Sequence, residues 1–223
     1  MLRDAVKWLL FELGAGYYAH KLSSGPEADL RREFADFLAP PPGARVLDVG
    51  CGPGHLAREL ARRGCRVSAV DRGRRLLRIA RKLAARESSA VEFFRARGER
   101  LPFPDASFEL TIATTVIYWV ERPREVLREM VRVTRPGGAV ATLDPHVSMS
   151  VASVRDYARQ KHLNETDTQK LVAWAHASER CWRFREEELR ALLAEAGLDN
   201  LQLERRLDGL VWFARGTVPA RRI

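Results

Sequence analysis

The chain has 223 residues, of which 46% are hydrophobic and 30% are charged, and its formal net charge is +9. This composition excludes a disordered chain, and the length predicts a single domain, 1–223, with a sizeable core. No stretch approaches the ~20 uncharged apolar residues of a membrane span. The 3 cysteines show no paired metal spacing and indicate reduced thiols, so a cytoplasmic protein is expected.

Residues 1–39 predict two helices that form an N-terminal cap, separated by "SSGPE" and closed by "APPPG". The first helix resembles a secretory signal only superficially, because Asp4, Lys7 and Glu12 interrupt its apolar residues. We therefore interpret it as an amphipathic helix.

Between 44 and 144, strands alternate with helices. Strands are predicted at 45–49, 66–71 and 91–96, at the start of 108–120, and at 138–144. Helices are predicted at 53–64, 74–87 and 123–138, the last ended by Pro136 and Gly137. Because hairpin turns are missing here, we predict a doubly wound α/β sheet covered on both faces. Its ligands should lie at the carboxyl ends of the strands.

Two further segments follow this core. Residues 146–182 predict a helical lid inserted after the fifth strand, and 183–216 predict a final helix and two strands. A tight turn at Asp208-Gly209, a dipeptide typical of hairpins, joins these two strands.

A glycine loop, "VLDVGCGPG", joins the first strand to the next helix. Gly50, Gly52 and Gly54 give G-x-G-x-G, whereas a dinucleotide fingerprint requires G-x-G-x-x-G, and His55 occupies its last position. The Gly-Lys-Ser or Gly-Lys-Thr of a phosphate loop is absent. Asp48 precedes the loop, and its carboxylate would repel a pyrophosphate but suits a ligand with an ammonium group.

Asp71 ends the second strand, 19 residues after Gly52. In doubly wound folds, an acidic residue at this place binds the two hydroxyls of a ribose. A ligand with a ribose and an amino acid end but no phosphate is S-adenosylmethionine. The sequence therefore predicts this cofactor.

Four motifs, "VLDVGCGPG", "VDRG", "LPFPDASFEL" and "LREMVRVTRPGG", occur in the order and spacing of a known family. With them, the chain resembles a class I S-adenosylmethionine-dependent methyltransferase of the small-molecule and quinone-type group, closely over 44–144 and in general architecture over 183–216. The resemblance implies a Rossmann-like, seven-stranded, mostly parallel sheet whose last strand is antiparallel. It also implies cofactor-binding roles for Asp48, Gly50, Cys51, Gly52, Gly54, Asp71, Arg72, Thr114 and Tyr18.

Within that resemblance, the glycine loop would cradle the methionine moiety, Asp71 would bind the ribose and Arg72 would flank the adenine. Thr114 would lie beside the methionine portion. Tyr18 lies in an N-terminal helix that the family often folds over the cofactor.

The adenine end departs from the family pattern. In the family, an aspartate followed two residues later by a glutamate commonly precedes the Leu-Pro pair. Here "ARGERLPF" places Arg97 at the aspartate position and Glu99 at the later one. A guanidinium cannot accept a hydrogen bond from the adenine amino group. Either Glu99 or backbone carbonyls replace the aspartate, or Arg97 stacks on the adenine. Alternatively, Arg97 points to solvent and pairs with Glu99.

The methyl acceptor is expected in an apolar and aromatic site at the carboxyl ends of the fourth and fifth strands. Methyl transfer is an in-line displacement, which needs an aligned nucleophile and needs a base only if the acceptor arrives protonated. Tyr118 follows the fourth strand, and His146 follows the fifth as the candidate general base. No metal is predicted, because His162, His176 and Cys181 match no common metal spacing.

Two other functions stay open. From His55 to Arg100 there are 14 Arg or Lys and 5 Asp or Glu, which accounts for the whole net charge and indicates an RNA (tRNA) methyltransferase as one alternative. Solvated helix faces also explain this charge, and the Pro-Pro-Tyr and paired-glutamate signatures of other methyltransferases are missing, so a small-molecule acceptor is favoured. The departure at Arg97 motivates the other alternative, a non-catalytic module that binds the cofactor or a partner. The sequence predicts no oligomeric state.

Overall fold

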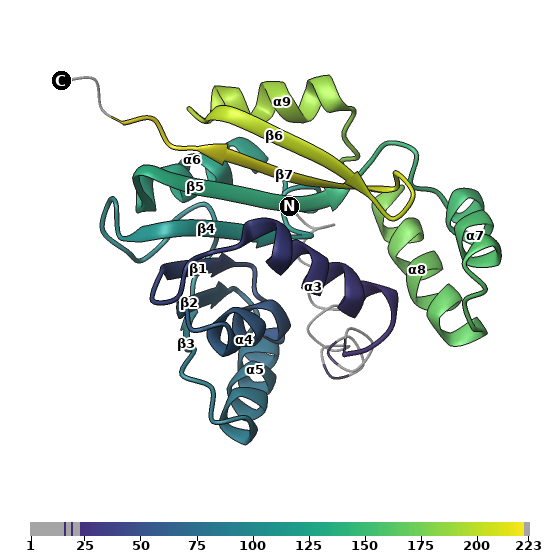
Figure 1. Ribbon diagram of the computed structural model, residues 1–223, viewed down its shortest axis with the longest axis horizontal. Helices are drawn as coiled ribbons and strands as arrows, with labels where there is room; N and C mark the ends of the chain where they lie inside the picture. Colours follow the sequence, from purple (N-terminus) through teal and green to yellow (C-terminus); the bar gives the residue numbers. More distant parts are fainter. Residues whose placement is uncertain (1–15, 17–18, 20–22, 221–223) are drawn as a thin grey trace.

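A computed structural model describes residues 16, 19 and 23–220 of the chain and shows a seven-stranded sheet (Figure 1). The strands are β1 (Arg45–Val49), β2 (Arg66–Asp71), β3 (Glu92–Arg95), β4 (Phe108–Thr114), β5 (Thr134–Pro145), β6 (Asp199–Arg206) and β7 (Val211–Thr217). Their order in the sheet is β3-β2-β1-β4-β5-β7-β6. Most of the first predicted helix, with Tyr18, lies outside the described residues.

The strands from β1 to β5 pair in parallel, and β7 runs antiparallel to both β5 and β6. This pairing confirms the predicted doubly wound, mostly parallel sheet with an antiparallel last strand. The chain runs outward from β1 to β3 and then returns to β4, so the strand order reverses between β1 and β4. A crevice at such a reversal, outside the carboxyl ends of the strands, is where doubly wound folds bind their ligands.

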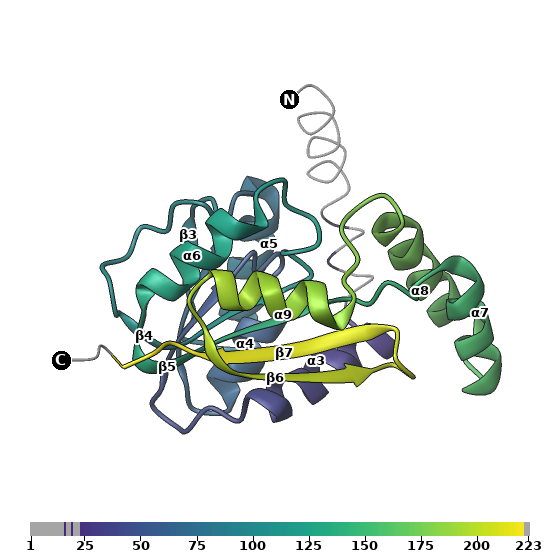
Figure 2. The ribbon, with the colours of Figure 1, turned by 90° about the horizontal axis from the view of Figure 1, so that it is seen from above.

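Helices cover both faces of the sheet, as predicted (Figure 2). They are α3 (Pro26–Leu38), α4 (His55–Arg62), α5 (Arg74–Arg86), α6 (Pro123–Val133), α7 (Val151–Gln160), α8 (Glu165–Ser178) and α9 (Glu186–Glu195). Helices α3 and α4 contact each other on one face, and α6 and α9 contact each other on the opposite face. Each buries an apolar stripe at helical spacing, such as Leu56, Ala57 and Leu60 in α4.

Helix α3, the second helix of the predicted cap, packs on the sheet. Phe34 is fully buried, and its ring lies 4.9 Å from the ring of Phe213 in β7. Asp36 forms an ion pair with Arg63, at the end of α4, at 2.6 Å. Helix α3 is therefore part of the layer that covers the sheet.

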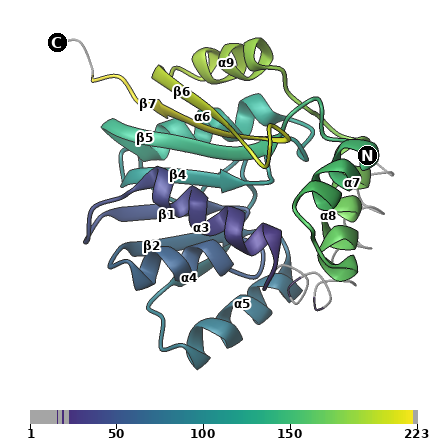
Figure 3. The same ribbon diagram turned by 45° about the vertical axis from the view of Figure 1, so that its right-hand side comes forward.

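The insertion after β5 is helical, as predicted. Helices α7 and α8 pack against each other and stand beyond the carboxyl ends of β4 and β5 (Figure 3). Side chains cap both helices, because Ser150 accepts a hydrogen bond from the backbone N–H of Ser153, and Asn164 accepts one from that of Asp167. Side-chain N-caps therefore fix where α7 and α8 begin.

The structure corrects one predicted boundary. Helix α6 ends at Val133, and the strand β5 begins at Thr134, so the segment predicted to end the helix at Pro136 and Gly137 belongs to the strand. The Thr134 hydroxyl donates to the carbonyl of Met130 at 2.7 Å, and the helical region is unfavourable for the residue that precedes Pro136. The turn between β6 and β7 covers 207–210 and includes the predicted Asp208-Gly209.

Within the part of the chain that the structure describes, no helix is long and apolar enough to cross a bilayer.

Candidate functional site

The glycine loop joins β1 to α4 at the crevice. Gly50, Gly52 and Gly54 all have positive φ angles, of 72°, 54° and 74°, a region that favours glycine. The backbone N–H groups of Gly50 and Cys51 donate to the carbonyl of Val70 in β2, at 2.8 and 3.0 Å. A Cβ atom on Gly50 would overlap the side chain of Val116, so glycine is required there for packing as well. The loop is thus fixed by bonds within the chain.

Asp71, at the end of β2, also holds this loop. One carboxylate oxygen accepts a hydrogen bond from the N–H of Gly52 at 2.9 Å, and the other accepts from the N–H of Gly73 at 2.7 Å. A carboxylate oxygen accepts more than one hydrogen bond, so both can also accept from hydroxyl groups. The structure therefore brings the predicted ribose-binding carboxylate and the glycine loop together.

Asp48 lies beneath the loop, with only 1% of its surface exposed. The backbone of Ala57 in α4 donates to its carboxylate, and Oδ1 has no hydrogen-bond partner among the described residues. Burial, and secondarily the nearby Asp71, raises the pKa of Asp48 to about 7. The two carboxyl groups, at the ends of the neighbouring strands β1 and β2, disfavour an anionic ligand and favour a cationic one. This arrangement fits the ammonium-bearing ligand inferred from the sequence.

Cys51 contributes its backbone to the loop. Its side chain is buried, and burial raises the pKa of the thiol well above its usual value. The thiol therefore stays protonated near neutral pH.

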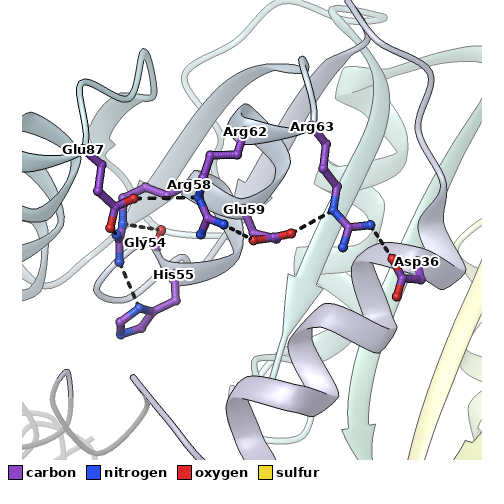
Figure 4. A network of polar contacts seen from close by, with 8 residues as sticks. All are labelled: Asp36, Gly54, His55, Arg58, Glu59, Arg62, Arg63 and Glu87. Atoms are coloured by element: carbon purple, nitrogen blue, oxygen red, sulfur yellow. Dashed lines mark hydrogen bonds and ion pairs between the residues drawn. The ribbon is translucent and has the colours of Figure 1, made fainter.

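A buried arginine, which the sequence analysis missed, braces the loop from below (Figure 4). Arg58 is 4% exposed, and its Nε donates to the carbonyl of Gly54 at 3.2 Å. The same guanidinium contacts Glu87, at the end of α5, and lies 2.9 Å from Nδ1 of His55. His55 Nε2 in turn lies 3.0 Å from the carbonyl oxygen of Ala19, and burial lowers the pKa of His55 to about 4. No sequence pattern distinguishes Arg58 from the exposed arginines around it.

At the predicted adenine end, Arg97 points to solvent. Its side chain is 65% exposed, and its Nε lies 3.6 Å from a carboxylate oxygen of Glu99. This is the solvent-exposed pairing that the sequence analysis offered as one alternative. Arg72 is also exposed, and its carbonyl accepts a hydrogen bond from Arg95 at 3.3 Å.

Thr114, expected just after the fourth strand, is the last residue of β4, and the chain then bends sharply. Thr115 has a φ of 57°, which is unusual for a β-branched residue. Tyr118 is only 5% exposed, and its ring packs edge-on against Trp119. Trp182, which follows α8, donates its backbone N–H to the carbonyl of Tyr118 at 3.0 Å, while 55% of its surface is exposed. Aromatic side chains therefore gather at the carboxyl end of β4.

His146, the predicted base, follows β5 and packs against Trp212 of β7, with the rings 5.3 Å apart. The backbone N–H of Ser148 donates to His146 Nδ1 at 3.0 Å, so Nε2 carries the proton in the neutral ring. Burial, Arg205 and Arg185 lower the pKa of His146. The imidazole is thus neutral near pH 7, and its one acceptor nitrogen is already occupied.

Asp144, the penultimate residue of β5, was not selected from the sequence. It is fully buried, and its Oδ1 accepts a hydrogen bond from the backbone N–H of Tyr118 at 3.0 Å. It ends a strand just as Asp48 and Asp71 do, so the rule that selected those two residues could also have found it.

Residues 47–142 match a protein family described as a methyltransferase domain. A malonyl-[acyl-carrier protein] O-methyltransferase from Pseudescherichia vulneris is 33% identical over 159 residues, which cover 66% of this chain and 62% of that protein. A demethylmenaquinone methyltransferase from Clavibacter sepedonicus is 29% identical over 207 residues, covering 90% of this chain and 84% of that protein. Two further malonyl-[acyl-carrier protein] O-methyltransferases match over 45% and 49% of their length, so this chain spans about half to two thirds of such relatives.

Among solved structures, phosphoethanolamine N-methyltransferase 2 from Haemonchus contortus, in complex with S-adenosyl-L-methionine, aligns with a TM-score of 0.71. The alignment covers 94% of this chain and 57% of that chain at 16% identity. At this identity, the likeness shows a shared fold.

Proposed function

Because the chain carries a class I S-adenosylmethionine-dependent methyltransferase domain, we propose that it transfers the methyl group of S-adenosylmethionine to a small organic acceptor. One observation carries the proposal. The glycine loop and the Asp71 carboxylate are bonded to each other at the strand reversal, above the buried carboxyl of Asp48. This combination suits a ribose and a positively charged amino acid end and disfavours a phosphate.

The residues of this site fit the cofactor. Asp71 would accept hydrogen bonds from the ribose hydroxyls, and the glycine loop would hold the methionine portion. The carboxyl of Asp48, with one oxygen unpartnered, would face the positive end of the ligand. S-adenosylmethionine, when bound, supplies a methyl group activated by a sulfonium. The chain's own contribution is to bind, to orient the acceptor and to exclude water.

The residues at the carboxyl ends of β4 and β5 favour a methyl acceptor that is already nucleophilic at neutral pH. His146 is the predicted base, but Ser148 occupies its only acceptor nitrogen, and Tyr118 is buried. A carboxylate, or a carbon made nucleophilic by its own ring, needs no protein base. Two of the relatives are named for a malonyl-[acyl-carrier protein] and a demethylmenaquinone, and such molecules offer acceptors of these two kinds.

Calorimetric titration with S-adenosylhomocysteine tests the cofactor, with NAD as the negative control. We expect micromolar binding for the unaltered chain and ~10- to 100-fold weaker binding in Asp71→Ala. The chain would then be incubated with labelled S-adenosylmethionine and a malonyl thioester or a reduced demethylnaphthoquinone. Transfer of label to one of these small molecules is expected. A folded chain that does not bind S-adenosylhomocysteine would contradict the proposal.

RNA is a second candidate acceptor because of one surface feature. Helix α5 contains no acidic residue, and its basic residues are exposed on the outer side: Arg74, Arg75, Arg78, Arg81, Lys82 and Arg86. Such a face suits a phosphate backbone. Bulk tRNA in the same transfer assay separates the two functions, since label would appear in RNA and not in the small molecules.

A further inference from the structure

The residue that carries a further inference is Asp144, a buried carboxyl outside the cofactor loop. It accepts a hydrogen bond from the backbone N–H of Tyr118 and another from that of Ile117. The neighbouring Thr142 hydroxyl also favours its charged form, and among the described residues Oδ2 has no hydrogen-bond partner of normal geometry. Burial of a carboxyl costs free energy, because it penalises the charged form, unless hydrogen bonds compensate for the lost hydration. The bonds that Asp144 makes are therefore expected to have a structural purpose.

These bonds hold a short turn, formed by residues 115–120, between β4 and α6. The backbone N–H groups of Trp119 and Val120 both donate to the carbonyl of Val116, at 2.9 and 3.1 Å, which makes one helical turn. Asp144 accepts from the N–H groups at the start of that turn, where a carboxylate is most favourable. Asp144 thus caps the 115–120 turn from a neighbouring strand.

The turn is also strained at its first residue. Thr115 has a φ of 57°, and its N–H donates to the carbonyl of Leu143 at 2.7 Å. A β-branched residue keeps such a conformation only when its surroundings fix it. The bonds to Leu143 and Asp144 supply that restraint, and both come from the end of β5.

The 115–120 turn contacts both sides of the crevice. Val116 packs directly against Gly50 of the glycine loop, where even a methyl group would not fit. On the other side, the carbonyl of Tyr118 accepts the N–H of Trp182, which follows the two helices of the insertion. The turn therefore contacts both the cofactor loop and the segment that follows the helical insertion.

We propose that Asp144 is a positioning residue for methyl transfer, which fixes the 115–120 turn and thereby the spacing between the cofactor loop and the acceptor side. This inference rests on the proposed function. Asp144 is fully buried, so it acts through the turn and does not touch the acceptor. Burial raises the pKa of Asp144 to about 7, so its charge changes in a range that is easily measured.

The test follows the backbone amides of Ile117 and Tyr118 by NMR in the full chain, with and without S-adenosylhomocysteine. In the unaltered chain, both amide signals should shift with a midpoint near pH 7. Ligand binding should also move them, because Val116 contacts Gly50. In Asp144→Asn, which keeps the side-chain size, the pH-dependent shift should vanish. In Asp144→Ala, both amides should exchange with solvent at least ~10-fold faster, and the effect of the ligand on them should be lost.

Asp208→Asn is the matched control, because Asp208 lies in the β6–β7 turn, is exposed and pairs with Lys161 at the end of α7. It should leave all these signals unchanged. Amides of Ile117 and Tyr118 that exchange equally slowly in Asp144→Ala, or that respond to the ligand as in the unaltered chain, would overturn the proposal. Calorimetry on the unaltered chain tests the proposed function separately from the role of Asp144. If the unaltered chain does not bind S-adenosylhomocysteine, the proposed function is contradicted. The pH-dependent shifts and the amide exchange rates of the Asp144 variants still test whether Asp144 fixes the turn.

Discussion

The cofactor half and the acceptor half of the crevice are built in different ways. The cofactor half, made by β1, β2 and the glycine loop, is fixed by bonds between this loop and the end of β2, the next strand in the chain, and by three glycines with positive φ. The acceptor half joins the 115–120 turn, Asp144 and Trp182, which lie far apart in the chain. The comparison teaches that one half depends on backbone shape, and the other on contacts between distant segments.

The largest effect is expected from Gly50→Ala, which would break the cofactor half. Alanine at a φ of 72° is strained, and its methyl group would overlap Val116. The backbone strain and the overlap each cost ~1–3 kcal/mol in the conformation of the loop that binds the ligand. Affinity for S-adenosylhomocysteine, measured by calorimetry, should therefore fall ~1,000-fold. Gly197→Ala is the control, because Gly197 has a φ of 93° with nothing within 4 Å of the added atom. Tight binding by a folded Gly50→Ala chain would show that glycine is not required at position 50 for ligand binding.

Each half also contains one buried carboxyl whose titration should affect stability. The pKa values of Asp48 and Asp144 rise from 3.8 to about 7 on folding, so between these values the folded chain binds more protons than the unfolded one. The free energy of unfolding should therefore fall as pH rises from 4 to 7, by at most roughly 4 kcal/mol per carboxyl. Urea denaturation across this range measures it.

Variants of the two carboxyls sharpen the comparison between the halves. Asp144→Asn and Asp48→Asn should each remove part of the pH dependence of stability. Because Asp71 contributes to the raised pKa of Asp48 but not to that of Asp144, Asp71→Asn should reduce only the Asp48 part. An unchanged slope in both single variants would mean that neither carboxyl titrates in this range.

A smaller effect is expected when Asp71 is replaced by alanine. The variant loses the acceptor for Gly52 and Gly73 as well as the predicted bonds to ribose. Hydrogen bonds to a charged group contribute ~1.5–3 kcal/mol, so affinity for S-adenosylhomocysteine should fall ~10- to 100-fold. Asp105→Asn, an exposed partner of Arg132, serves as the control and should bind normally. Unaltered affinity in Asp71→Ala would separate this carboxylate from cofactor binding.

The smallest effect should come from Trp182→Ala, in the acceptor half. The backbone bond from Trp182 to Tyr118 survives the change, and only the exposed ring is lost. Aromatic contacts contribute ~0.5–1.5 kcal/mol, so the KM for an aromatic acceptor should rise ~2- to 10-fold. Trp182→Phe keeps an aromatic ring, so its KM for the acceptor should stay close to that of the unaltered chain. A change in S-adenosylhomocysteine affinity instead would mean that the two halves are not separable at this residue.

The cofactor half could be predicted from the sequence because local rules decide it. The glycines at 50, 52 and 54 indicate the positive φ angles, and Asp71 ends a strand that the apolar pattern already defines. The order of strands and helices was enough for the parallel, doubly wound core of the sheet, and the antiparallel last strand was expected from the family resemblance. The end of α6 was misplaced because the Pro136-Gly137 signal lies inside β5, where Thr134 already has an extended backbone.

The acceptor half was harder to predict because its contacts join distant residues. The position of Asp144 near the end of β5 can be predicted from the sequence, but its bond to Tyr118, 26 residues earlier in the chain, cannot. His146 follows β5 as expected, but the sequence does not reveal that Ser148 occupies its Nδ1. The roles of Tyr118, His146 and the other predicted site residues remain predictions for the experiments above.

The bond between Asp71 and Gly52 has a consequence for how affinity is shared. Since the carboxylate already holds the loop, a ligand does not have to order it on arrival, and the loss of entropy on binding is smaller. Preorganisation of this kind lets the cofactor side keep its affinity when segments that do not contact the loop change. The two helices beyond the 115–120 turn can therefore change in sequence, and with them the molecule that receives the methyl group.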